Sequence, residues 1–134
     1  MDSQPSVLIV DRSDESREVL RTVLAQRGLR IFEANAAEQG LKLAREHQPD
    51  LIVVDVEVES SSPEQITDDF ALASQSHRTP LVVLGTVRRK LPQFPSDRIL
   101  RKPYHYAPLI RKIEELLEAG AESLPVQRPA AKAA

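Results

Sequence analysis

Three ionisable residues stand at places in the chain where a parallel β-sheet would bring them to one edge. Asp11 and Asp55 each follow an unbroken apolar run, and Lys102 follows a shorter one. Ligands of an open α/β sheet bind beyond the carboxyl ends of the strands, where the winding direction reverses. Two carboxylates at such a place are oxygen ligands of the kind that a divalent cation prefers. The pattern therefore predicts an acidic crevice with a lysine at the same end of the sheet.

The elements that must position these residues alternate along the chain. Short apolar runs predict strands buried on both faces, and the amphipathic patterns between them predict helices. The expected strands cover residues 7–10, 29–34, 51–54, 81–84 and 99–100. This alternation indicates a doubly wound parallel sheet with helices on both faces. In the strand order 2-1-3-4-5, the reversal lies between the first and third strands, which lead into Asp11 and Asp55.

Residues that cap or interrupt helices mark the expected helix ends. Ser13 is the expected N-cap of the first helix, and Gly28 suits its end. Asn35 and Glu38 resemble a capping box for the second helix, which Pro49 terminates. The third helix is expected to start at Ser62 and Pro63, and the last carries an apolar stripe of Leu109, Ile110, Ile113, Leu116 and Leu117, with Gly120 beyond its end.

Length and composition limit the kind of protein that this can be. A chain of 134 residues suffices for one domain, expected over residues 1–120, and residues 121–134 are expected to form a flexible tail or linker. A net charge of −2 argues against a nucleic-acid-binding domain. Cysteine is absent, which excludes thiolate metal sites and leaves the redox compartment open. No apolar run approaches the ~20 residues of a membrane helix, so we expect a cytoplasmic protein.

Four segments resemble, in order and spacing, the receiver domain of response regulators in bacterial two-component signalling. They are residues 7–11, 49–55 and 79–84 and the pair Lys102-Pro103. The resemblance implies a flavodoxin-like α/β fold whose third-strand aspartate, here Asp55, accepts a phosphoryl group from a histidine kinase. It also implies that acids after the first strand, here Asp11, hold Mg²⁺ and that Lys102 pairs with the phosphoryl oxygens. The metal and the lysine would shield the attacking carboxylate from the negative charge of the donor.

Several positions of the expected pocket depart from the family pattern. Arg12 replaces an acid that ligates the metal directly in the family, and a cation cannot ligate Mg²⁺. Gly85 stands where a hydroxyl residue is expected, with Thr86 beside it, and Ile99 replaces the switch aromatic. Because side chains alternate along a strand, the pattern does not place the Thr86 hydroxyl in the pocket.

Two connecting segments depart as well. Residues 56–62 lack the proline and glycine turn that usually follows the phosphoacceptor. The segment from Gly85 to Lys102 is about five residues short and contains Pro92 and Pro95, so the family's fourth helix is expected to be shortened or lost. That helix belongs to the family's common contact face, so we expect partners that differ from those of ordinary regulators.

Formal charges around the crevice give these departures an electrostatic interpretation. Asp11 and Asp55 stand against Arg12 and Lys102, which balances without a metal, and Glu57 adds one negative charge if it turns inward. We hypothesise that Arg12 replaces the metal, that no cofactor is required, and that Mg²⁺ binds weakly, through Asp11 and Asp55 if at all. An Arg12 side chain turned into solvent would instead leave two acids able to hold a weak metal.

Structural roles remain open for the same residues. Asp55 could hold a salt bridge to Lys102, and Asp11 could cap the following helix or pair with Arg12. The remaining charged candidates are typical of a solvated surface and lack metal-ligand spacing: the run Arg88-Arg89-Lys90, and His47, His77 and His105.

Three functions fit these patterns. The first is a non-enzymatic receiver-like module that acts through contacts with a histidine kinase, an output domain or another regulator, or as a homodimer. For this module we expect neither a membrane nor a nucleic acid as a partner. The second is a working receiver, phosphorylated on Asp55 despite Arg12. The third is a small phosphatase of the haloacid dehalogenase type, because Asp55-Val56-Glu57 faintly resembles its nucleophile motif, which normally has an aspartate at the position of Glu57.

Overall fold

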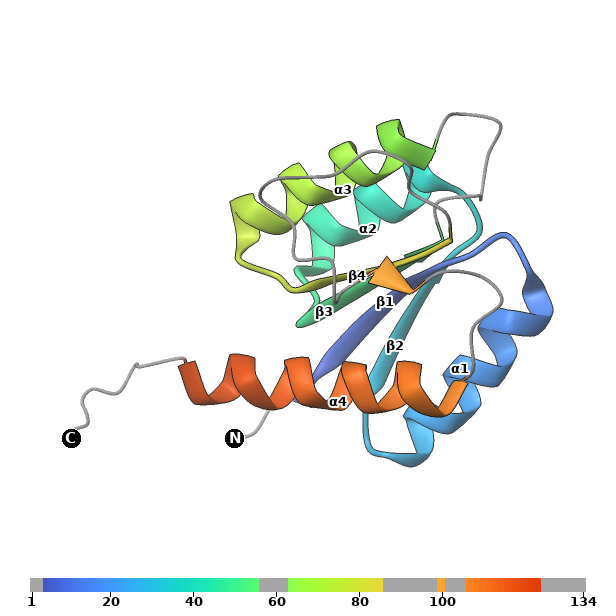
Figure 1. Cartoon of the computed structure of the whole chain (residues 1–134), viewed down its shortest axis with the longest axis vertical. Helices are drawn as coiled ribbons and strands as arrows, with labels where there is room; N and C mark the ends of the chain where they lie inside the picture. Colours follow the sequence, from blue (N-terminus) through green and yellow to red (C-terminus); the bar gives the residue numbers. More distant parts are fainter. Residues whose placement is uncertain (1–3, 56–62, 86–98, 101–105, 124–134) are drawn as a thin grey trace.

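A parallel sheet forms the centre of the computed structural model, which describes residues 4–55, 63–85, 99–100 and 106–123. Its strands run in the order β2-β1-β3-β4-β5 (Figure 1). The strands are β1 (Ser6–Val10), β2 (Arg30–Ala34), β3 (Leu51–Asp55), β4 (Leu81–Leu84) and β5 (Ile99–Leu100). The described helices are α1 (Asp14–Gln26), α2 (Ala37–His47), α3 (Pro63–His77) and α4 (Tyr106–Ser123).

Two of the described helices cover each face of the sheet. Helices α2 and α3 pack on one face, and α1 and α4 pack on the other (Figure 1). Because side chains alternate along a strand, Val10 packs in the first core, between the sheet and helices α2 and α3. Ile9 packs in the second core, between the sheet and helices α1 and α4. Strands β1, β3 and β4 are buried along their whole length, as expected for strands covered on both faces. The predicted stripe of the last helix is confirmed, with Leu109, Ile110, Ile113 and Leu116 buried in the second core and Leu117 packed at its edge.

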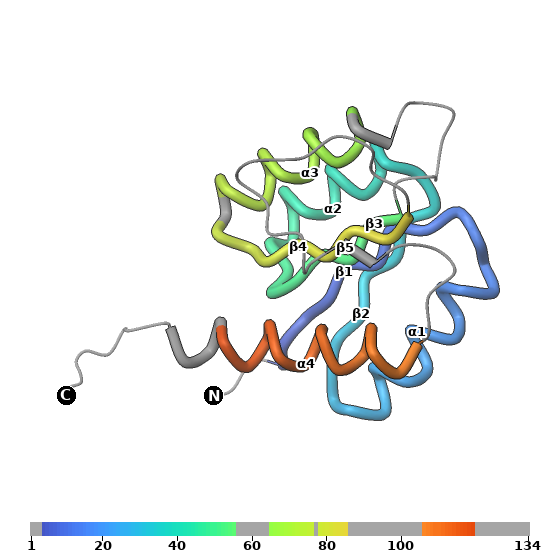
Figure 2. The backbone as a smooth tube through the Cα atoms, in the orientation of Figure 1, coloured from blue at the N-terminus to red at the C-terminus, as the bar shows by residue number. Residues whose placement is uncertain are grey.

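The sheet agrees with the architecture that the sequence predicts. The parallel doubly wound arrangement and the order of the first four strands are confirmed. Figure 2 shows these four strands from β2 to β4. Beyond them, β5 consists of two residues, which pair with Val83 and Leu84 of β4. The expected loss of a helix concerns residues 86–98, which lie outside the described part of the chain, as do residues 124–134 of the expected tail. No helix in the described residues is both long and apolar enough to cross a membrane.

Most helix ends lie where capping residues predict them. The Ser13 hydroxyl accepts a hydrogen bond from the N–H of Ser16 at 3.1 Å and caps α1. Gly28 follows that helix with φ at 84°, a conformation that glycine adopts without strain. Gln48 closes α2 directly before Pro49, and α3 begins at Pro63 as predicted.

Two predicted helix ends are wrong. Helix α2 is preceded by Ala36 at its N-cap, so Asn35 lies one residue too early for a capping box. The N–H of Asn35 instead donates to Oε1 of Gln39 at 3.3 Å. Helix α4 continues through Gly120 to Ser123. A single glycine between alanines costs a helix only about 1 kcal/mol, which is too little to end it there.

Candidate functional site

Asp11 and Asp55 lie side by side at the carboxyl edge of the sheet. Val10 pairs with Val54 across β1 and β3, and each aspartate is the next residue of its chain segment. Adjacent strands of a sheet are about 4.8 Å apart, so the two residues are direct neighbours. Their exposed fractions are only 2% and 5%, so both carboxylates are nearly removed from bulk water. The structure therefore brings together the two acids that strand-end position predicts.

The backbone and side chain of Asp11 form a fixed turn between β1 and α1. Its N–H donates to the carbonyl of Ala34 at 3.0 Å, which extends the pairing of β1 with β2 by one residue. Its Oδ1 accepts a hydrogen bond from the N–H of Ser13 at 2.9 Å. A carboxylate that accepts from the N–H two residues later stabilises a turn of its own backbone. Oδ1 of Asp11 thus stabilises the turn that leads into α1.

Arg12, between these two residues, has an exposed side chain. Among the ion pairs between described residues, none involves its guanidinium. An exposed guanidinium is a poor neutralising charge for two buried carboxylates because water screens it. The metal-replacing role of Arg12 stays a prediction, and the solvent-facing alternative matches where its side chain lies.

A second arginine, which sequence reasoning did not single out, reaches the turn from α1. Nη1 of Arg17 donates to the backbone carbonyl of Asp11 at 2.7 Å, and its Nε donates to Oε1 of Glu33 at 3.2 Å. Its Nη2 pairs with the carboxylate of Asp14. With only 14% of its side chain exposed, Arg17 satisfies its buried guanidinium through three different segments. The sequence signal for this contact is Glu33, a charged residue within the largely apolar segment 29–34.

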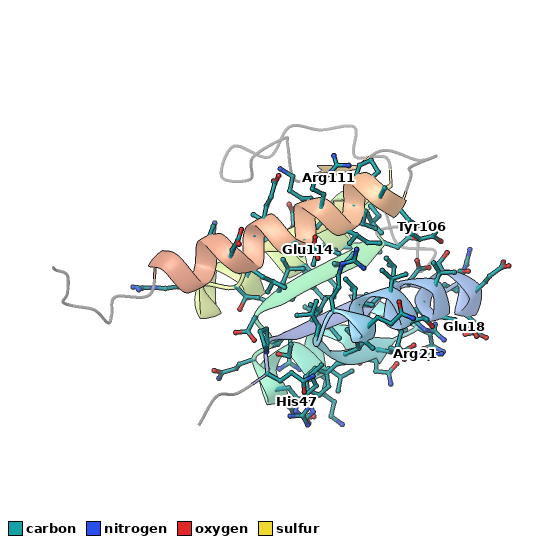
Figure 3. The ribbon with its side chains drawn as sticks, turned by 90° about the horizontal axis from the view of Figure 1, so that it is seen from below. Glu18, Arg21, His47, Tyr106, Arg111 and Glu114 are labelled. Carbon is teal, nitrogen blue, oxygen red and sulfur yellow. The ribbon has the colours of Figure 1, made fainter. Side chains whose placement is uncertain are left out.

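Arg21 lies one turn further along α1 and shares Glu33 with Arg17. Its Nη1 donates to Oε2 of Glu33 at 2.8 Å. The hydrogen bond and the charge of Glu33 raise the pKa of Arg21 above its ordinary value, with a smaller contribution from Glu18 on the same helix (Figure 3). A carboxylate thus links two helix positions to the edge strand next to the site.

Gly85 directly follows β4, at the position where a hydroxyl residue is expected. It is buried, and its φ of 124° lies in a region that residues with a side chain rarely adopt. A serine or threonine would be strained in this backbone conformation. The missing hydroxyl therefore accompanies a backbone shape that suits glycine.

The remaining predicted site residues are placed only in part. Ile99 is the first residue of β5 and pairs with Val83. His47 is exposed at the end of α2, and its ring stacks on Phe32 with centroids 4.4 Å apart. The other candidates lie outside the residues whose structure or side chains are described: Glu57, Thr86, the run Arg88-Arg89-Lys90, Lys102, His105 and the side chain of His77.

The described donors fit a firmly bound Mg²⁺ poorly. No group of three acidic, histidine or cysteine residues gathers in the described part of the chain. Asp11 and Asp55 remain, but Oδ1 of Asp11 already accepts the Ser13 N–H and Arg12 follows directly. Mg²⁺ demands near-ideal octahedral oxygen geometry and loses its water reluctantly, so it rewards additional carboxylates rather than a nearby cation.

Comparison with known proteins identifies the family. The model of the response regulator receiver domain matches residues 7–114. The chain is 36% identical over 83 residues to the transcriptional regulatory protein AfsQ1 of Streptomyces coelicolor, which covers 60% of this chain and 34% of AfsQ1. It is 23% identical over 116 residues to protein PilH of Pseudomonas aeruginosa, which covers 83% of this chain and 96% of PilH. The first of these relatives is thus much longer than the segment matched.

Solved receiver structures share the fold at low sequence identity. A CheY-like response regulator receiver domain protein from Methanospirillum hungatei superposes with a TM-score of 0.75 at 18% identity, over 91% of this chain and 100% of that one. The receiver domain of the Francisella response regulator 1452 gives 0.71 at 22% identity, over 86% and 98%. Because the receiver-domain model matches residues 7–114 and the strands follow the doubly wound order, the chain belongs to the response regulator receiver domains of two-component signalling.

Proposed function

We propose that this receiver domain signals through protein contacts, without catalytic turnover and with weak or no Mg²⁺-dependent phosphorylation. The observation that carries the proposal is the turn after β1. Its only described acid, Asp11, uses one oxygen to hold the Ser13 N–H, and the next residue is the exposed cation Arg12. In the described residues Asp55, which is 5% exposed, therefore has Asp11 beside it but no third acid that would complete a metal site.

The physical consequence concerns the approach of a phosphoryl donor. A carboxylate attacking a phosphoryl group meets the negative charge of the donor, and a metal ion normally neutralises that charge. Arg12 cannot ligate a divalent cation at a position where the family has an acid, and from its exposed position it supplies little positive charge to Asp55. The crevice is therefore expected to stay in one charge state over ordinary Mg²⁺ concentrations.

Partners are expected to be proteins of the same signalling class. AfsQ1 of Streptomyces coelicolor and KdpE of Escherichia coli are transcriptional regulatory proteins, and the chain matches 34% of each. An output domain, a histidine kinase or another regulator is therefore the expected partner type, with a homodimer as the alternative.

The second candidate is a working receiver that is phosphorylated on Asp55. It is favoured by the exposed position of Arg12, which leaves the two aspartates adjacent and buried at the switch point of the sheet. In this case Asp11 and Asp55 would hold a weakly bound Mg²⁺, and Asp55 would accept the phosphoryl group directly.

A small phosphodonor separates the two candidates. The full chain is incubated with acetyl phosphate and Mg²⁺, and intact mass is recorded beside the variants Arg12→Asp, Asp55→Asn and the double variant. We expect no adduct on the natural chain, an adduct on Arg12→Asp, and none on the double variant. A stable adduct on the natural chain that Asp55→Asn removes would establish the second candidate. Steady hydrolysis of a generic phosphate ester would instead support the phosphatase alternative.

A further inference from the structure

We propose that Arg17 is the positioning residue of the acidic crevice. Through the backbone carbonyl of Asp11, it fixes the turn after β1. This turn sets the position of the Asp11 carboxylate and the direction in which the side chain of residue 12 points. The inference deepens the proposed function, and it rests on that function only in supposing that residue 12 controls access of a metal to Asp11 and Asp55.

The contacts of Arg17 join three segments around the turn. Its Nη1 donates to the Asp11 carbonyl at 2.7 Å, its Nη2 pairs with Asp14 in the first turn of α1, and its Nε donates to Glu33 of β2 at 3.2 Å. A planar guanidinium offers these donors in a rigid fork, so the three partners are held at fixed relative positions. A lysine carries its three donors on one nitrogen, so it cannot reproduce the spaced, planar arrangement that reaches all three partners.

Asp11 is restrained from three directions as a result. Its N–H is bound to Ala34 in β2, its carbonyl to Arg17 in α1, and its Oδ1 to the N–H of Ser13. Both sides of the Asp11 peptide are therefore fixed before the chain reaches residue 12. Removing the Arg17 contact frees the peptide between Asp11 and Arg12 to rotate, which weakens the Asp11–Ser13 bond that depends on its direction.

The same helix supplies a matched control. Arg21 also binds Glu33, at 2.8 Å, but among the described contacts it reaches no atom of the turn. Its side chain is 46% exposed, against 14% for Arg17. Replacing either arginine removes a partner of Glu33, whereas replacing Arg17 alone releases the Asp11 carbonyl. A difference between the two variants at the turn therefore reports the positioning role.

The first test is amide hydrogen exchange of Ser13, measured by NMR in the natural chain and in Arg17→Gln, Arg17→Lys and Arg21→Gln. Exchange of Ile9 in the centre of β1 corrects for global stability. We expect Ser13 exchange relative to Ile9 to accelerate about tenfold in Arg17→Gln, which is the scale of one lost hydrogen bond. Arg17→Lys should restore part of the protection, and Arg21→Gln should change the ratio less than twofold. An unchanged ratio in Arg17→Gln, or an equal rise in Arg21→Gln, overturns the proposal.

The second test uses Mg²⁺ as a probe in the Arg12→Asp background, with binding followed by amide chemical shifts near Asp11 and Asp55. Groups that orient metal ligands are worth about 10–100-fold in metal affinity, so adding Arg17→Gln should weaken Mg²⁺ binding at least tenfold. Adding Arg21→Gln should change it less than twofold. If Arg12→Asp alone binds no Mg²⁺, the proposed function has lost its support, while Ser13 exchange still decides the role of Arg17.

Discussion

Gly40 of α2 lies so close to Val10 of β1 that a Cβ atom on the glycine would come within 2.6 Å of Val10 Cγ2. The same atom would lie 3.1 Å from Cζ of Phe70 in α3. Helix α2 can therefore approach the sheet, and share a core with α3, only because position 40 has no side chain. Val10 directly precedes Asp11, so this close approach also supports the strand end that carries the site.

The first prediction is that Gly40→Ala destabilises the domain. Alanine improves helix propensity by about 1 kcal/mol, but overpacking a tight core contact typically costs about 1–3 kcal/mol. The fully buried Val10 and Phe70 cannot move into open space, so we expect a net loss in the free energy of unfolding, measured in urea. Lys42→Ala, at an exposed position of the same helix, should have little effect. The loss should shrink when Val10→Ala provides room, and a neutral Gly40→Ala would contradict the packing described.

The second prediction concerns Asp50, which ties the beginning of β3 to the beginning of β1. Its Oδ2 accepts the N–H of Ser6 at 2.8 Å, and its own N–H donates to the carbonyl of Ser6 at 2.9 Å. Asp50→Ala leaves the Ser6 N–H without this acceptor, which typically costs about 1–3 kcal/mol for a buried donor. Asp50→Asn keeps an acceptor oxygen and should lose less. Thermal unfolding of both variants checks this order, and equal losses would show that the carboxylate charge matters more than the hydrogen bond.

Much of this architecture is visible in the sequence because apolar runs and strand ends are local patterns. Residues 51–54 are apolar without interruption, which is what a strand covered on both faces requires, and Asp55 follows at once. The pairing of β1 with β3 then places Asp11 beside Asp55 with no further information. The strands and the two acids at their ends were therefore predictable from spacing, whereas the neighbourhood of the acids also required the strand order 2-1-3-4-5.

Other features depend on contacts between distant segments, which no local pattern contains. Arg17 and Glu33 lie 16 positions apart and meet only once α1 folds against β2. Gly40 looks like a weak point in a helical pattern, whereas in the fold it is where α2 meets Val10. Gly85 illustrates the same limit, because the sequence shows the missing hydroxyl but not the φ of 124° that accompanies it.

The third prediction follows from the aromatic contact at the edge of the sheet. The rings of Phe32 and His47 stack with an interplanar angle of 15°, and the Arg30 guanidinium lies 5.1 Å from the Phe32 ring centre. A stacked pair contributes about 0.5–1.5 kcal/mol beyond the area that it buries. We expect the ring protons of His47 to be shifted upfield by the Phe32 ring current and to return toward free-histidine values in Phe32→Leu. Unshifted His47 protons in the natural chain would show that the stack is not populated in solution.

The fourth prediction is that salt affects the stability contributions of Arg17 and Arg21, both in α1, to different extents. Since Glu33 raises the pKa of Arg21 above its ordinary value, the arginine charge contributes fully at any pH below that ordinary value and is lost only as pH rises through the raised value. The Arg21 guanidinium therefore stays charged near neutral pH, whereas salt can screen its attraction to Glu33. At 1 M NaCl the screening length falls to about 3 Å, so the small destabilisation of Arg21→Gln at low salt should vanish. Arg17→Gln should keep most of its loss, about 1.5–3 kcal/mol, because its guanidinium is nearly buried and binds the Asp11 carbonyl directly. Urea unfolding of both variants at low and high salt measures this contrast, and an equal salt dependence would mean that Arg17 acts only as a surface charge.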